Sequence, residues 1–107
     1  MIFKWFDTKD VDALADRMAG DLRMRIPPAK LEAGGRKSES KKDRTHDMVL
    51  RQALNFARGN RLNVYTKARL ANRFKWALLE AGYPKDFVDR MTMELATVIG
   101  IAQAKRK

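Results

Sequence analysis

Apolar side chains recur at steps of three and four residues in four separate segments of this chain. That spacing is the period of an amphipathic α-helix, and no stretch of useful length shows the alternation of a β-strand. The sequence therefore predicts an all-α fold, a small bundle of about four helices in a single domain. We expect the helices at about residues 9–25, 41–58, 63–81 and from residue 84 onward.

Glycine and proline mark where the predicted helices end. Ile26 precedes Pro27, and a residue before proline is disfavoured in the α region, so the first helix should stop there. Gly59 and Gly82 stand where a left-handed residue usually follows a helix, and Pro84 suits the first turn of the next one. The short connection through Gly82 predicts that the last two helices are neighbours, either antiparallel or crossed.

A basic segment between the first two helices lacks the side chains that a packed element needs. From Ala33 to Asp43 no apolar side chain is larger than alanine, and glycine, serine and lysine dominate. Such a composition buries too little surface to order itself. We therefore predict a flexible basic linker over residues 29–40, with Ser38 or Ser40 capping the next helix. It separates residues 1–28, the N-terminal apolar segment and first helix, from a three-helix unit at residues 41–107.

Positive charge is concentrated in one stretch of the chain. Of the formal net charge of +10, residues 36–75 carry +9, with twelve Lys or Arg against three Asp or Glu. A concentrated field of one sign attracts polyanions and speeds encounters with them. The partner classes that this charge indicates are a nucleic acid, either DNA or RNA, and an acidic protein.

The candidate binding residues lie on the outer faces of the second and third predicted helices. On the second helix three arginines are spaced seven residues apart, so they share one line along its surface. On the third helix aromatic rings alternate with guanidinium groups, and such a surface can stack on bases while it neutralises phosphates. The predicted nucleic-acid-binding residues are Lys41, Lys42, Arg44, Arg51, Arg58, Arg61, Tyr65, Arg69, Arg73 and Trp76.

These residues predict a small non-enzymatic protein that binds nucleic acid mainly through phosphates, with little sequence specificity. The alternative is an adaptor module that docks an acidic protein through the same basic aromatic face. Trp76 has two interpretations, an exposed anchor beside the arginines or a core side chain under the first helix. A helix-turn-helix reader fits poorly, because Asn55 stands where the first helix of that motif needs a small residue.

The sequence offers little support for catalysis or for a metal site. The chain has no cysteine, so disulfides, thiolate metal sites and thiol nucleophiles are excluded. The only histidine, His46, lies between Asp43 and Asp47, and these residues suit the first turns of a helix as well as a two-ligand metal site. No phosphate-binding loop or nucleophile motif is present. We therefore expect no enzyme activity, no cofactor and no metal.

The N-terminal side chains are too apolar to stay in water, and the residues concerned are Ile2, Phe3, Trp5 and Phe6. We interpret them as a lid on the bundle, with a homodimer interface or a membrane-surface anchor as alternatives. The longest apolar run is far shorter than the ~20 residues that span a bilayer, and the start of the chain lacks the apolar core of a signal peptide. We therefore expect a cytoplasmic protein without a membrane span.

Overall fold

The computed structural model describes residues 8–32 and 34–105, and these residues form helices and connections without a strand. The four α-helices are α1 (Thr8–Arg25), α2 (Arg36–Gly59), α3 (Val64–Ala81) and α4 (Lys85–Ala104). A short 3₁₀ turn, η2 (Pro28–Lys30), lies between α1 and α2. The predicted all-α fold is therefore confirmed. The apolar N-terminal side chains, Ile2, Phe3, Trp5 and Phe6, lie outside the described residues.

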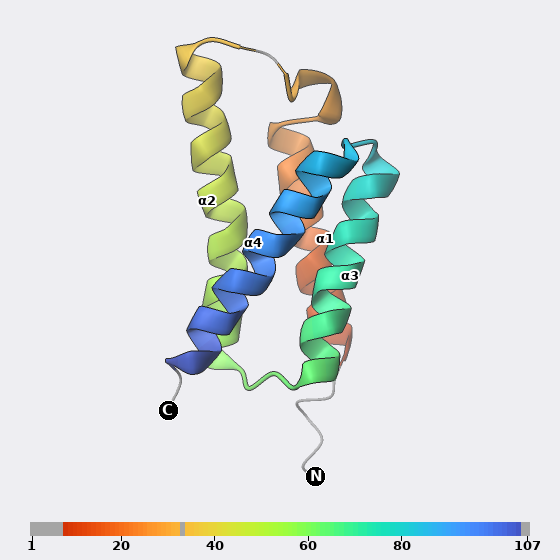
Figure 1. Cartoon of the computed structure of the whole chain (residues 1–107), viewed down its shortest axis with the longest axis vertical. Helices are drawn as coiled ribbons and strands as arrows, with labels where there is room; N and C mark the ends of the chain where they lie inside the picture. Colours follow the sequence, from red (N-terminus) through yellow and green to blue (C-terminus); the bar gives the residue numbers. More distant parts are fainter. Residues whose placement is uncertain (1–7, 33, 106–107) are drawn as a thin grey trace.

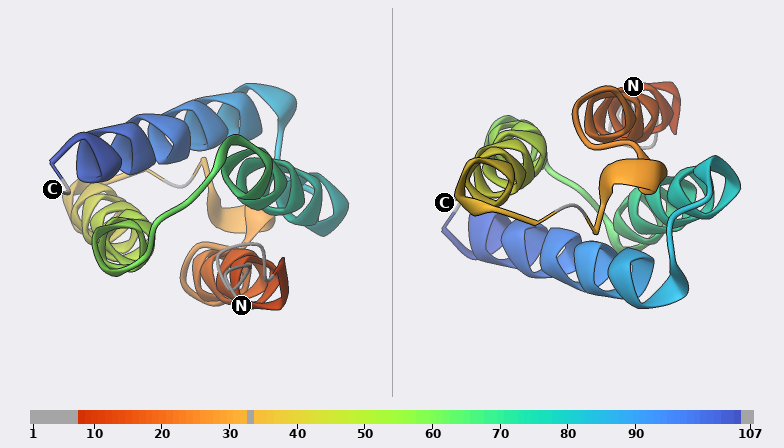
Figure 2. Two further views of the ribbon diagram at one scale, coloured as in Figure 1. Left: turned by 90° about the horizontal axis from the view of Figure 1, so that it is seen from below. Right: turned by 90° about the horizontal axis from the view of Figure 1, so that it is seen from above.

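Each helix runs antiparallel to the one before it, so α1 is parallel to α3 and α2 is parallel to α4 (Figure 1). Seen along the bundle, the helices follow the order α1, α2, α4, α3 around the core (Figure 2). α2 and α3 are consecutive in the chain but stand diagonally opposite, and residues 60–63 cross one end of the bundle to join them. This placement excludes a helix-turn-helix unit of α2 and α3, because the two helices of that motif pack on each other.

The core is built from the apolar stripes that the sequence predicts on the four helices. Phe74 of α3 lies at its centre and is fully buried, with Leu70 and Leu78 one turn away on the same face. This confirms the predicted rotation of the third helix. The buried residues of α4 are Val88, Met91, Leu95, Ile99 and Ala102, and Val98 is partly buried beside them. None of the helices in the described part of the chain has the length and apolar character needed to cross a bilayer.

The end of α3 follows the predicted punctuation, and its start has a cap that the sequence analysis did not name. Asn63 accepts a hydrogen bond from the Thr66 backbone N–H, and the Thr66 hydroxyl accepts one from the Asn63 N–H, which makes a capping box. Gly82 ends the helix in a left-handed conformation, with a φ of 102° that a residue with a Cβ adopts only at a cost. Pro84 is the N-cap of α4, one residue before the helix begins.

The end of α2 differs from the prediction. Gly59 is its last helical residue, and among the described glycines only Gly35 and Gly82 have a positive φ. Side chains satisfy the terminal carbonyl groups instead. The Asn60 amide donates to the Phe56 carbonyl at 3.0 Å, and the Gln103 amide donates to Ala57 at 2.6 Å. The prediction of a left-handed conformation at Gly59 was therefore wrong, because the side chains of Asn60 and Gln103 cap this end of the helix instead.

α2 also begins at Arg36, earlier than the sequence predicts. Its N-cap is Gly35, without a side-chain cap, so neither Ser38 nor Ser40 caps this helix. The first turns include an ion pair in which Lys42 lies 3.3 Å from Glu39. Helical structure thus occupies both ends of the predicted linker, and residues 31–35 join η2 to α2. The flexibility of this segment stays a prediction.

Candidate functional site

The outer face of α3 exposes the two aromatic residues of the predicted binding surface. Tyr65 and Trp76 are 56% and 57% exposed, so Trp76 is not a core residue. The Lys75 ammonium lies 5.7 Å from the centroid of a Trp76 ring, within the range of a cation–π contact. Both aromatic side chains line an open groove of about 560 Å³, whose other wall is formed by residues of α1.

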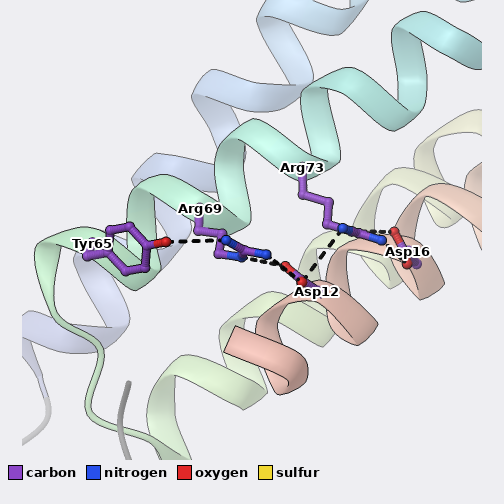
Figure 3. Close-up of polar contacts among 5 residues, drawn as sticks. All are labelled: Asp12, Asp16, Tyr65, Arg69 and Arg73. Atoms are coloured by element: carbon purple, nitrogen blue, oxygen red, sulfur yellow. Dashed lines mark hydrogen bonds and ion pairs between the residues drawn. The ribbon is translucent and has the colours of Figure 1, made fainter. Parts of the chain in front are cut away.

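The two arginines between these aromatic residues are held by α1 (Figure 3). Arg69 donates two hydrogen bonds to Asp12, at 2.8 and 2.9 Å, and one to the Tyr65 hydroxyl at 3.2 Å. Arg73 donates two hydrogen bonds to Asp16, at 2.9 and 3.0 Å, and also lies 3.6 Å from the Asp12 carboxylate. Because α1 and α3 run parallel, two acids one turn apart meet two arginines one turn apart. α1 therefore neutralises two cations that would otherwise be available to a polyanion.

The pairing shifts the ionisation of the groups involved. Hydrogen bonds from Arg69 lower the pKa of Asp12, although partial burial of this carboxyl acts in the opposite direction. Hydrogen bonds to Asp12 raise the pKa of Arg69, and those to Asp16 raise the pKa of Arg73. Asp12 and the two arginines are therefore charged at neutral pH, and the contacts between them are ion pairs.

An acid titration should reveal the contribution of Asp12 to stability. A carboxyl whose pKa is lower in the folded protein stabilises the fold above its unfolded pKa of about 3.9, and this stabilisation is lost as the pH falls. Asp12→Asn is expected to lower the free energy of unfolding by about 0.5–1 kcal/mol at pH 7, as for a partly exposed ion pair. Urea denaturation should show this difference shrinking below about pH 4. A difference that stays constant down to about pH 2 would contradict a role for the charge.

A second line of arginines runs along the outer side of α2. Arg44, Arg51 and Arg58 are all exposed, as predicted, and neighbours along this line are ~10 Å apart at 1.5 Å per helical residue. Arg44 and Arg51 form no ion pair with any residue that the structure describes. Lys41 near the start of α2 and Arg61 just beyond its end are exposed as well. We call Lys41, Arg44, Arg51, Arg58 and Arg61 the α2 ridge.

The predicted binding residues thus divide into two groups. The α2 ridge contains five of them, whereas Tyr65, Arg69, Arg73 and Trp76 lie on α3, diagonally across the bundle. The tenth, Lys42, is paired with Glu39. The two basic helices therefore do not form the single continuous surface that their closeness in sequence suggests.

No family model, curated protein or solved structure matches this chain.

His46 joins α2 to α4 through a contact between its Nε2 atom and the Glu94 carboxylate. The carboxylate of Asp47 lies 3.8 Å from Nδ1 of the same ring. The sequence pattern pointed to Asp43 and Asp47 but missed Glu94, which is distant in the chain. Among the residues that the structure describes, no group of three His, Asp or Glu side chains is placed to hold a metal ion.

The acids opposite α3 were also missed by the sequence analysis. Asp12 and Asp16 are one helical turn apart, a spacing that is visible in the sequence. Their pairing with Arg69 and Arg73 depends on the parallel alignment of two helices that are distant in the chain. No local pattern contains that information.

Proposed function

We propose that this protein binds nucleic acid through the α2 ridge, mainly by contacts with phosphates. The observation that supports the proposal is that Arg44 and Arg51 are exposed and have no acidic partner among the described residues, whereas Arg69 and Arg73 are neutralised. A cation that is free of internal partners can replace the counterions of a phosphate backbone, which drives this kind of binding.

The dimensions and charges of the ridge favour backbone contacts over base recognition. Its helical part, from Lys41 to Arg58, is ~26 Å long at 1.5 Å per residue, which is shorter than the ~34 Å turn of B-DNA. One side of a duplex can therefore contact the whole ridge. Asp47 lies between Arg44 and Arg51 and is 74% exposed at its side chain. Its carboxylate opposes deep entry of α2 into a groove lined by phosphates.

The test is the salt dependence of binding to a short random-sequence duplex, measured by fluorescence anisotropy. With about five phosphate contacts, the logarithm of affinity should fall with the logarithm of salt concentration at a slope of about −4 to −5. Arg44→Gln and Arg51→Gln should each weaken binding several-fold and make the slope shallower by about one unit. A second duplex of unrelated sequence should bind equally well, because phosphates carry no base information.

Two control variants test whether binding depends on the α2 ridge or on positive charge anywhere on the protein. Arg25→Gln removes an exposed arginine of α1, and Arg69→Gln removes one that is paired with Asp12. Both should leave the slope unchanged. Equal losses in all four variants, or no binding to duplex or single-stranded DNA and RNA at low salt, would contradict the proposal.

The second candidate function is an adaptor that docks an acidic protein, and the exposure of Trp76 favours it. An exposed Trp beside cations is a common anchor of protein interfaces. Trp76→Ala should leave duplex binding unchanged if the α2 ridge is the binding surface. An adaptor would instead lose its complex with a defined acidic protein in this variant, with no dependence on added nuclease.

A further inference from the structure

α4 presents an outer face without charge. From residue 91 to residue 104 its exposed side chains are Met93, Ala96, Thr97, Gly100, Ile101 and Ala104. Glu94 lies in the same stretch with its side chain 40% exposed, but it contacts His46 of α2. In the whole chain 34% of residues are charged, so six exposed residues of one helix without a charge among them are unexpected on a solvent-facing surface. α4 forms one edge of the bundle, with α2 and α3 on its inner side (Figure 2). We call these six residues the α4 face.

The largest apolar side chains of this face are left exposed in the protomer. Met93 and Ile101 are 69% and 51% exposed, although burial would favour both. The Thr97 hydroxyl donates a hydrogen bond to the Met93 carbonyl, so its donor is already used. Such a face meets an apolar partner without leaving that donor unsatisfied.

Gly100 leaves room for another surface to approach this face closely. It lies inside α4, where glycine is a poor helix former, and a Cβ added there would meet no atom within 4 Å. The fold of the protomer therefore gives no reason for glycine at this position. With Ala96 and Ala104 one turn away on either side, it lets the axis of a second helix come close.

A hollow lies beside the face, between α2 and α4. It has a volume of about 250 Å³, and it is lined by apolar side chains that include Leu54, Val98 and Ile101, together with the basic residues Arg58 and Lys105. Met93 stands two turns away along α4, ~12 Å at 1.5 Å per residue. Its long, flexible and exposed side chain is of a kind that fills apolar gaps. The surface thus carries both a protruding apolar side chain and a hollow.

We propose that the α4 face joins two copies of this chain in an antiparallel, two-fold symmetric dimer. Thr97 is midway between Met93 and Ile101, so a two-fold axis at Thr97 brings each Met93 level with the hollow beside the partner's Ile101. The same contact then occurs twice, as an isologous interface requires.

The charges at the two ends of the face support the antiparallel direction. Thr97 is also midway between Asp89 and Lys105. Asp89 is paired with Lys85 of the same helix at 2.9 Å, so the same axis brings this neutral pair level with the partner's Lys105. Lys105 is exposed and makes no ion pair with any described residue. A parallel dimer would instead place Lys105 beside the partner's Lys105, which like charges disfavour.

Sedimentation equilibrium of the full chain over a range of concentrations tests for the dimer. A single helix face buries less area than the ~1,200 Å² of a standard interface, so we expect a concentration-dependent monomer–dimer equilibrium. Met93→Glu should weaken dimerisation at least about tenfold, because it places a charge inside the contact. Met24→Glu is the matched control, since Met24 is 82% exposed on α1, away from the α4 face. It should leave the equilibrium unchanged.

Cysteine cross-linking tests the direction of the helices, and the chain has no cysteine that would interfere. Thr97→Cys places a thiol on the axis, so treatment with oxidised glutathione should convert most of the dimer to a disulfide-linked form. Asp89→Cys should not cross-link, because the two copies of residue 89 lie at opposite ends of the contact. Circular dichroism would confirm that each variant is folded.

Four results would overturn the proposal. The first is a wild-type chain that stays monomeric up to about 1 mM, the weak end of specific association. The second is a dimer that survives Met93→Glu, which would point to another surface such as the N-terminal apolar residues. The third is equal loss of dimer in Met93→Glu and Met24→Glu, and the fourth is efficient cross-linking through Asp89→Cys.

Discussion

Replacing Phe74 with alanine is expected to lower the free energy of unfolding by about 3–5 kcal/mol. Phe74 is fully buried among apolar side chains of the bundle, so its removal leaves a cavity as well as losing the transfer of the ring from water. Chemical denaturation monitored by circular dichroism measures this change. A loss of this size is a large part of the total stability of a domain of this length.

Trp76→Ala is the matched control for that prediction. Trp76 is on the same helix, two positions further on, and is 57% exposed. Its replacement is expected to change the free energy of unfolding by no more than about 0.5 kcal/mol, as for most surface positions. Equal costs for the two variants would mean that α3 is rotated about its axis relative to the arrangement described above.

Tyr83→Phe is expected to cost about 1–3 kcal/mol, because it leaves a buried carbonyl group without its partner. The Tyr83 hydroxyl donates a hydrogen bond of 2.5 Å to the Ile26 carbonyl, which joins the end of α1 to the turn before α4. The Tyr83 ring also stacks on Phe87, with 5.1 Å between centroids, and this contact survives the substitution. The loss in stability therefore reports on the hydroxyl alone.

The other tyrosine of the chain provides the control. The Tyr65 side chain is exposed and its hydroxyl accepts a hydrogen bond from Arg69, so Tyr65→Phe should cost no more than about 0.5 kcal/mol. An equal loss in the free energy of unfolding for both variants would contradict a larger stabilising contribution from the buried hydrogen bond of Tyr83.

Alkaline pH gives a second measurement on Tyr83. Burial raises the pKa of Tyr83 to about 12. In the unfolded chain the phenol ionises near its usual pKa of about 10. The folded state therefore holds this proton more tightly, and its advantage is present below about pH 10 and declines as the pH rises toward 12. The stability difference between the wild type and Tyr83→Phe should narrow over that interval.

Local features of the fold were predicted where neighbouring residues are sufficient to specify them. The left-handed conformation of Gly82 and the buried side of α3 depend on side chains within a few positions of each other. Gly59 shows the limit of such reasoning. Gln103, far along the chain, takes one of the carbonyl groups at that helix end, and no rule based on neighbouring residues includes it.

The candidate site shows the same division between local and distant information. The sequence predicted an exposed line of arginines from their seven-residue spacing along one helix, and Arg44 and Arg51 are exposed in the structure. The neutralisation of Arg69 and Arg73 could not be predicted from the sequence, because their acidic partners are on α1. A net charge summed along the sequence counts all four arginines alike, although two are neutralised.

The sequence by itself determined that this chain forms four amphipathic helices, where most of them end and which faces are apolar, because helix period, capping and backbone preference act over a few residues. The tertiary structure alone decided the order of the helices around the core and the alignment of α1 with α3. These depend on how whole surfaces pack together. That packing neutralised Arg69 and Arg73 with acids of α1, left the arginines of α2 exposed, and placed the face of α4 that exposes Met93 and Ile101 at the edge of the bundle.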